Sequence, residues 1–209
     1  MLLVFAFLGA VLAAPSGWKV VGVTDGVEVA QQSSQGSDLL SFRGEKISTV
    51  HISKLAGLLR DDPKATEWVD LMSVSDGLLR IDERTKYLYQ VYDLPWPVQD
   101  RDYLLKRTVN IDESNKVFTV TIVSTVNAQQ KPEQECCIRA DITRTLWHLQ
   151  SLGNGKTKVV VEVTTDPKGS LPAWVVNMLQ EDWPHKTVNG LLRRAQKSDI
   201  VPDPSVVGW

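Results

Sequence analysis

The segment from Pro95 to Ile111 constrains the fold more than any other part of the chain. Pro95 and Pro97 stand one residue apart, and because proline donates no backbone hydrogen bond, two of them cannot lie in a central strand. They predict a rigid, extended corner. The residues after the corner are rich in aromatic, β-branched and threonine side chains, which predicts a strand over Asp102 to Ile111.

One face of this strand is apolar except for a single charge. Side chains alternate between the two faces of a strand, so residues of one parity share a face. A guanidinium keeps its charge at ordinary pH and is costly to bury unpaired. Arg107 therefore requires an acidic neighbour, ordered water or an anionic ligand, and it is the sharpest functional signal in the sequence. The residues on this face are Tyr103, Leu105, Arg107, Val109 and Ile111.

The rest of the chain predicts further strands, two short helices and one long final helix. Helical spacing of apolar residues indicates helices at His51–Arg60 and Ala65–Val69. The final helix is expected from Pro172 to about Lys197, with Pro184 bending or interrupting it. The predicted strands are Trp18–Val23, Val27–Gln32, Asp38–Ile47, Ser73–Ile81, Tyr87–Asp93, Lys116–Val126, Cys137–Gln150 and Thr157–Thr165.

This order of elements predicts an α+β fold, in which a curved antiparallel sheet wraps around the last helix. A strongly curved sheet cannot sit flush on a helix, so a cavity is expected between them. No internal repeat or linker divides the 209 residues, which suit one domain at 18–197, with an irregular tail at 198–209.

Composition and motifs narrow the functional classes. The net charge is −2 and the isoelectric point is about 5.9, which gives no basic surplus for nucleic acid. The three histidines show no metal-ligand spacing, and no nucleophile elbow or phosphate-binding glycine loop is present. We therefore predict no metal, no cofactor and no catalytic residue.

The first 14 residues are almost wholly apolar and end in small residues, Ala13 and Ala14. They are too short to cross a bilayer as a helix, and the small residues stand where a signal peptidase would cut. A lysine or arginine before the apolar run is missing, which leaves a signal anchor or a mis-assigned start codon as alternatives. We expect a cleaved signal peptide over 1–14 and a secreted or periplasmic protein.

Cys136 and Cys137 are adjacent in the sequence. Adjacent cysteines rarely bridge without strain, so we expect no ordinary disulfide between them. A redox switch is one interpretation. The preferred one is two small, partly buried residues.

Four motifs, in the order of the predicted elements, resemble the START domain family, the lipid-transfer domains related to steroidogenic acute regulatory protein. Together they extend over about Val20 to Lys197. The motifs are Pro95-x-Pro97 with Arg101-Asp102-Tyr103 and Arg107; Pro132-Glu133-Gln134 with Ile138-Arg139-Ala140; Asp166-x-Lys168-Gly169-x-Leu171-Pro172; and Glu67-Trp68.

The resemblance implies a helix-grip fold, with a lipid-sized tunnel between the sheet and the C-terminal helix. It implies a gate loop at Asn127–Glu135, a lid helix at Leu171–Ala195, and a polar tunnel residue at Arg107. The expected ligand-binding residues are Arg107, Tyr89, Leu105, Val109, Val120, Ile122, Val176, Leu179 and Trp183.

The partner of Arg107 would indicate the ligand. On the neighbouring strand the candidates are Gln90 and Asp93, and neither is clearly aligned with it. Without an acid, Arg107 would favour a phosphate or carboxylate on the ligand. With Asp93 beside it, a neutral lipid such as a sterol becomes more plausible. Arg107 could also reach only the sheet edge and water. We expect Arg101 and Asp102 to hold the proline corner rather than to touch ligand.

The leading hypothesis is a monomer that encloses one phospholipid, fatty acid or sterol and touches membranes transiently to transfer it. One alternative is an enzyme on the same scaffold, cyclase-like or hydrolase-like, which would need converging polar groups with shifted pKa values. A second is an interaction module with a filled core, which would show an exposed apolar patch and no cavity.

Overall fold

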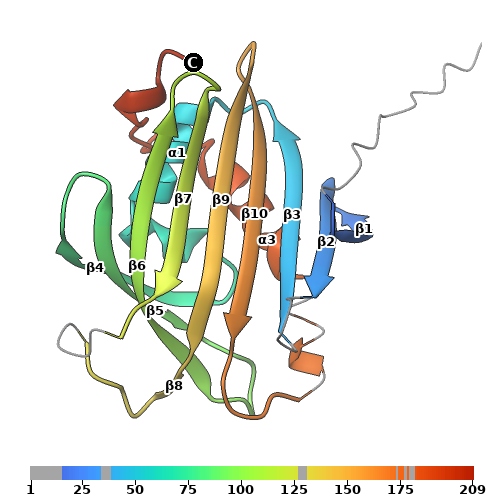
Figure 1. The fold of residues 1–209 in the computed structure, drawn as a ribbon, viewed down its shortest axis with the longest axis vertical. Coiled ribbons are helices and arrows are strands. Elements are labelled where there is room, and N and C mark those ends of the chain that lie inside the picture. The colour runs from blue at the N-terminus through green and yellow to red at the C-terminus, as the bar shows by residue number, and fades with distance from the viewer. Residues whose placement is uncertain (1–15, 34–38, 127–130, 173, 177, 179–181) are drawn as a thin grey trace, which may run out of the picture.

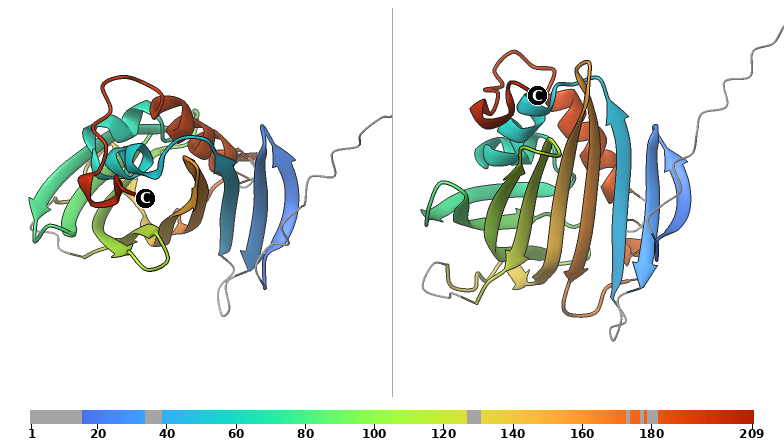
Figure 2. Two further views of the ribbon diagram at one scale, coloured as in Figure 1. Left: turned by 90° about the horizontal axis from the view of Figure 1, so that it is seen from above. Right: turned by 45° about the horizontal axis from the view of Figure 1, so that its top comes forward.

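One curved sheet forms most of the structure, and its helices lie on one side (Figures 1 and 2). The computed structural model describes residues 16–33, 39–126, 131–172, 174–176, 178 and 182–209. The strands are β1 (Lys19–Thr24), β2 (Val27–Ser33), β3 (Leu40–Ser48), β4 (Met72–Arg80), β5 (Thr85–Tyr92), β6 (Asp100–Asp112), β7 (Val117–Ser124), β8 (Cys137–Arg139), β9 (Asp141–Gly153) and β10 (Lys156–Asp166).

The strands follow the order β1-β2-β3-β10-β9-β7-β6-β5-β4, and neighbours in this order run antiparallel. The α+β class and the curved antiparallel sheet are therefore confirmed. One predicted strand, Cys137–Gln150, is wrong as a single element. It divides at Ala140, because β8 leaves the main path and pairs in parallel with the start of β6, where Ala140 donates to the carbonyl of Asp102.

The helices are α1 (Ile52–Arg60), the 3₁₀ helix η1 (Pro63–Glu67) and α3 (Trp183–Arg194). Residues 174–176 and 178 are also helical and Asp182 lies in a turn, while residues 179–181 are outside the described part. Pro184 stands at the start of α3, where its missing N–H has no intrahelical partner to lose. This position fits the predicted interruption of the final helix, which itself stays a prediction.

The main core lies between the concave face of the sheet and helices α1 and α3. It is built from the apolar positions that alternate along β7, β9 and β10 and from the apolar sides of both helices. Trp68 packs edge-on against Trp147, with ring centroids 5.5 Å apart. Gly190 of α3 passes so close to the chain that an added Cβ would lie 2.1 Å from the carbonyl oxygen of Trp68.

Most of the C-terminal tail is irregular, and the tail packs against α1. It contains the short 3₁₀ helix η2 (Pro204–Val206), and Val206 is fully buried in the core. His51, whose Nδ1 accepts from a backbone N–H of the first turn of α1, also places its Nε2 2.9 Å from the carbonyl oxygen of Trp209.

Candidate functional site

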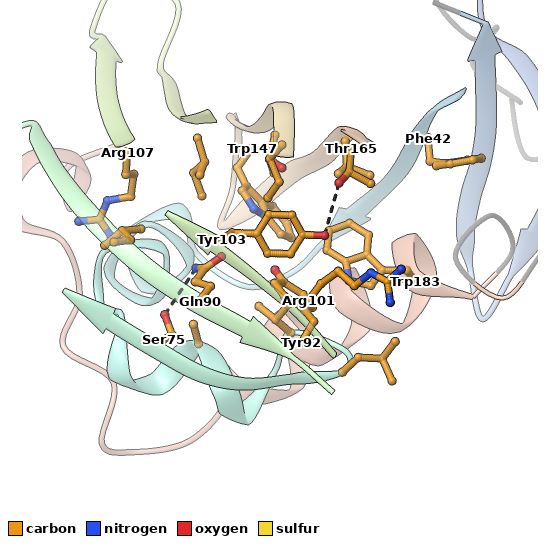
Figure 3. Close-up of a pocket in the computed structure, with 18 of the residues that line it drawn as sticks. Phe42, Ser75, Gln90, Tyr92, Arg101, Tyr103, Arg107, Trp147, Thr165 and Trp183 are labelled. Carbon is orange, nitrogen blue, oxygen red and sulfur yellow. Dashed lines mark hydrogen bonds between the residues drawn. The ribbon is translucent and has the colours of Figure 1, made fainter. Parts of the chain in front are cut away.

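A cavity of about 310 Å³ lies between the concave face of the sheet, η1 and the segment that leads into α3. This volume is at the lower end of the range of about 300–1,000 Å³ that is usual for small-molecule sites. Figure 3 shows side chains from widely separated elements around it. Its apolar wall includes Phe42, Leu59, Trp68, Leu88, Val120, Ile122, Ile142, Trp147, Val163, Leu171, Val176 and Trp183.

A charged corner of the cavity is formed by β6 and the turn after α1. Arg107 donates from its guanidinium to the carboxylate of Asp62 and, at 3.1 Å, to the carbonyl oxygen of Leu59. Both charged side chains are buried, with 8% and 4% of their surface exposed. A buried carboxylate and guanidinium are tolerable only when they pair in this way.

Asp62 also contacts the ammonium of Lys86, so one carboxylate serves two cations. Burial, and then the neighbouring Arg107, lower the pKa of Lys86 to about 8. Burial, and then the charge of Arg60, lower the pKa of Arg107 to about 10. The corner therefore holds one carboxylate between two cations, and Arg107 has an acidic partner.

That partner is neither of the candidates expected from the neighbouring strand. In the β5–β6 register Arg107 stands opposite Lys86, and Gln90 stands opposite Tyr103. Asp93 lies beyond the end of β5 and accepts a hydrogen bond from Ser73. The acid arrives instead from the turn that follows α1, which no strand register could have indicated.

Further polar groups are spread along the cavity wall (Figure 3). Gln90 donates to the hydroxyl of Ser75 at 3.5 Å, and the hydroxyls of Tyr103 and Thr165 are 3.5 Å apart. The indole Nε1 of Trp68 is buried with no hydrogen-bond partner among the described residues.

Arg101 lines the end of the cavity that lies near Trp183 (Figure 3). Its guanidinium donates to the backbone carbonyls of Gln99, Pro167 and Lys168. Arg101 therefore connects the residues after the proline corner to the turn that precedes the predicted lid helix. Arg101 thus holds the chain at Gln99, just after the corner, but it also forms part of the cavity wall. Asp102, which was expected to share the first role, binds Arg139 and Tyr89 instead.

Asp102 points to the opposite face of β6 from Arg101. It therefore contacts a different loop. It is fully buried and accepts two hydrogen bonds from Arg139, at 2.9 and 2.8 Å, and one from the hydroxyl of Tyr89, at 3.0 Å. Arg139 in turn donates to the carbonyls of Lys131 and Pro132. This network anchors the described end of the predicted gate loop, whose residues 127–130 lie outside the described part.

The predicted ligand-binding residues divide into two groups. Arg107, Val120, Ile122, Val176 and Trp183 line the cavity. Leu105 and Val109 are buried in the packed core beside it and are not among the described lining residues, and Tyr89 lies on the far face of the sheet. Leu179 lies outside the described residues.

Several residues that line the cavity were not among the predicted ligand contacts. Those on strands, Gln90, Thr145 and Trp147, carry the parity of the concave face, so a known strand register would have revealed them. Leu59, Asp62 and Trp68 come from α1 and the chain after it, where only the tertiary fold brings them to the sheet.

Cys136 and Cys137 form a disulfide with each other, which corrects the expectation that they stay unbridged. The bridge includes Cys137, the first residue of the short strand β8, which pairs with the start of β6. It is therefore a neighbour of the Asp102–Arg139 network rather than of the cavity.

Within the described ranges no group of three or more histidine, cysteine or acidic residues is placed to hold a metal ion. Among the same residues, no helix has the length and hydrophobicity needed to span a membrane.

Comparisons with known proteins agree with this architecture. A family model for the START domain matches residues 10–199. An uncharacterized protein of Pseudomonas aeruginosa is 31% identical over 196 residues, which are 93% of each chain. Phosphatidylcholine transfer protein of Bos taurus is 24% identical over 78% of this chain and 76% of its own. The structure of human StAR-related lipid transfer protein 5 superposes with a TM-score of 0.80 at 17% identity, over 88% of each chain. This chain therefore belongs to the START domain family.

Proposed function

We propose that this protein encloses one lipid molecule in the cavity and transfers it between membranes. The observation that carries the proposal is an apolar cavity with polar groups at defined places in its wall, closed on one side by the segment before α3. Enclosing an apolar ligand removes its surface from water, which stabilises the complex by about 25 cal/mol per Å². Membership of the START family, and similarity to a phosphatidylcholine transfer protein, support binding of a lipid.

We further propose a ligand whose polar end carries acceptor oxygens but no net negative charge, as in a sterol, a neutral glyceride or a zwitterionic phospholipid. The charge of Arg107 is already met by Asp62, so an acidic headgroup would face a neutralised guanidinium and the carboxylate beside it. The amide of Gln90 and the hydroxyls of Tyr103 and Thr165 belong to lining residues and offer neutral donors for an ester, hydroxyl or phosphodiester oxygen.

Side chains in the predicted lid helix support the proposal that the protein contacts membranes transiently. Val176 and Trp183 line the cavity from this segment, while Trp174 exposes 45% of its surface. Tryptophan is enriched where protein meets the lipid headgroup region. Movement of this segment at a bilayer would open the cavity and cover the exposed indole at the same time.

Binding is better supported than catalysis. A catalytic acid or base in the cavity would need a free titratable group with a shifted pKa. Asp62 is engaged by two cations, and Asp61 pairs with Lys64. Lys86, the lysine with the lowered pKa, is not among the residues described as lining this cavity.

The direct test is to purify the protein without detergent and to identify any bound lipid by native and lipid mass spectrometry. We expect one lipid per chain, and transfer of a labelled neutral or zwitterionic lipid between vesicles. Protein that carries no lipid and takes none up from vesicles of any headgroup class would contradict the proposal. A bound lipid with an acidic headgroup would leave binding intact but refute the selectivity.

Two variants test the selectivity. Asp62→Asn uncovers the charge of Arg107, so we expect the ratio of acidic to zwitterionic lipid taken up to rise. Arg107→Leu removes the charge, so we expect uptake of neutral lipid to change little. Arg144→Gln is a matched control, because this arginine is exposed on the outer face and pairs with Glu162.

Secretion remains a prediction from residues 1–14, which lie outside the described structure. N-terminal sequencing of the protein recovered from its native host would test it, with cleavage after Ala14 as the expected result. The monomeric state is likewise proposed. Light scattering of the lipid-loaded protein would test it.

A further inference from the structure

A second, separate hollow of about 210 Å³ lies beside the turn between β4 and β5, on the far side of the charged corner. Five of its lining side chains are cations and two are acids. No part of its lining is a hydrophobic side chain. The lining residues are Arg60, Arg80, Asp82, Glu83, Arg84, Thr85, Lys86 and Arg107.

Three of the acids near this hollow already have partners. Asp62 is shared by Arg107 and Lys86, and Asp203 of the tail pairs with Arg60 at 2.6 Å. Asp82 accepts the backbone N–H groups of the next residues in the hairpin turn, at 2.7 and 2.8 Å. In the lining itself, five cations stand against two carboxylates, Asp82 and Glu83, so positive charge is in excess.

Arg80 and Arg84 have no acidic partner in the described part of the chain. Arg80 donates its Nε to a backbone carbonyl, that of Asp82, at 3.1 Å, and the side chain of Arg84 makes no hydrogen bond or ion pair there. Both residues are exposed at the hairpin and reach the hollow from its open side.

Arg107 adds a second observation, because one donor of its guanidinium is unused. Arg107 is 7% exposed, and its Nε is buried with no hydrogen-bond partner among the described residues. The lowered pKa values of Arg107 and Lys86 are caused first by burial and then by a neighbouring cation. An anion in the hollow would relieve this repulsion, because it would face both side chains.

We infer that this hollow binds a phosphate group, held by the forked donors of Arg80, Arg84 and Arg60 with Lys86 behind them. Guanidinium groups suit this role because their planar N–H pairs match the oxygens of a phosphate. The phosphate belongs either to a soluble anion or to the phosphomonoester headgroup of a membrane lipid such as phosphatidic acid. The site is distinct from the lipid cavity, and only Arg107 contributes to both.

The test uses the full chain and inorganic phosphate as the probe, with binding measured by calorimetry at low salt. Arg80→Gln/Arg84→Gln removes the two exposed cations that have no acidic partner, and we expect phosphate affinity to fall by roughly tenfold or more. Arg193→Gln, at an exposed arginine of α3, should leave the affinity unchanged. Circular dichroism of both variants should match the parent protein, because these side chains are exposed.

Vesicle sedimentation then distinguishes the two sources of phosphate. Binding to phosphatidic acid vesicles that exceeds binding to phosphatidylcholine vesicles, and that inorganic phosphate displaces, would assign the site to a headgroup. Phosphate binding without this vesicle preference would assign it to a soluble anion. Absence of both, or equal loss in Arg193→Gln, would overturn the inference. Lipid uptake into the cavity is measured separately, so failure here leaves the proposed function standing.

Discussion

The carboxylate of Asp62 accepts a hydrogen bond from the guanidinium of Arg107, which lies on β6, 45 residues further along the chain. The contact joins the turn after α1 to β6, at the charged corner of the cavity. The backbone carbonyl of Leu59 accepts from the same guanidinium nitrogen. The helix end and the strand are therefore held by one charged group.

We predict that Asp62→Asn destabilises the protein by about 3–5 kcal/mol, because it leaves two buried or half-buried cations without their shared carboxylate. Arg107→Leu should cost less, since Asp62 keeps Lys86. The free energy of unfolding in urea measures both. Asp61→Asn is the control: this side chain is 33% exposed and pairs with Lys64, so its loss should cost less than about 1 kcal/mol. Equal costs for the two aspartates would contradict the assignment.

The need for a partner of Arg107 followed from the sequence, but the identity of that partner did not. Alternation along one strand shows that the guanidinium faces inward, since neighbouring positions of the same parity are apolar. The pairing partner depends on how the turn after a separate helix meets the sheet. In the β5–β6 register Lys86, and not an acid, stands opposite Arg107. Strand pairing alone therefore could not identify the partner of Arg107.

The same difference, between a pattern along one strand and a contact made by the tertiary fold, explains which other predictions were confirmed and which were wrong. Strands with strong alternation and turn residues between them were predicted within a few residues. The division of one strand at Ala140 was missed, because it depends on a parallel pairing with β6. The position of the tail could not be predicted, because its contacts, such as that of Asp203 with Arg60, are made with a helix about 140 residues earlier.

A second prediction concerns the network that holds the described end of the gate loop. Arg139→Met would leave the fully buried carboxylate of Asp102 with only the hydroxyl of Tyr89, so we expect destabilisation of about 3–5 kcal/mol. The loop should also be cleaved faster by protease, because Arg139 holds two of its carbonyls. Arg144→Met, at an exposed ion pair, should change neither quantity appreciably. An intact loop in Arg139→Met would show that other contacts position it.

A third prediction reverses the usual effect of a helical glycine. Replacing glycine by alanine inside a helix normally stabilises by about 0.5–1 kcal/mol. At Gly57 of α1, an added Cβ would lie 2.1 Å from the backbone carbonyl oxygen of Val201. Gly57→Ala should therefore destabilise by about 1–3 kcal/mol by pushing the tail away from the helix. Thermal unfolding measures the effect, and Gly22→Ala, which meets no atom within 4 Å, is the control. Stabilisation by Gly57→Ala would mean that the tail does not pack there.

The last prediction concerns pH. Burial, followed by the charge of Lys158, lowers the pKa of His148 below its usual value of 6.5, while Glu162 and Glu45 oppose this and Arg43 adds to it. The unfolded chain therefore binds this proton more readily than the folded protein, and stability falls as the pH drops below 6.5. His148→Gln removes the proton-binding group and keeps a polar side chain on the outer face. We expect its unfolding free energy, measured between about pH 7.5 and 5.5, to decline less steeply than that of the parent protein. If the stability profiles of the variant and the parent protein were parallel, the pKa of His148 would be the same in the folded and the unfolded protein. That result would contradict the prediction.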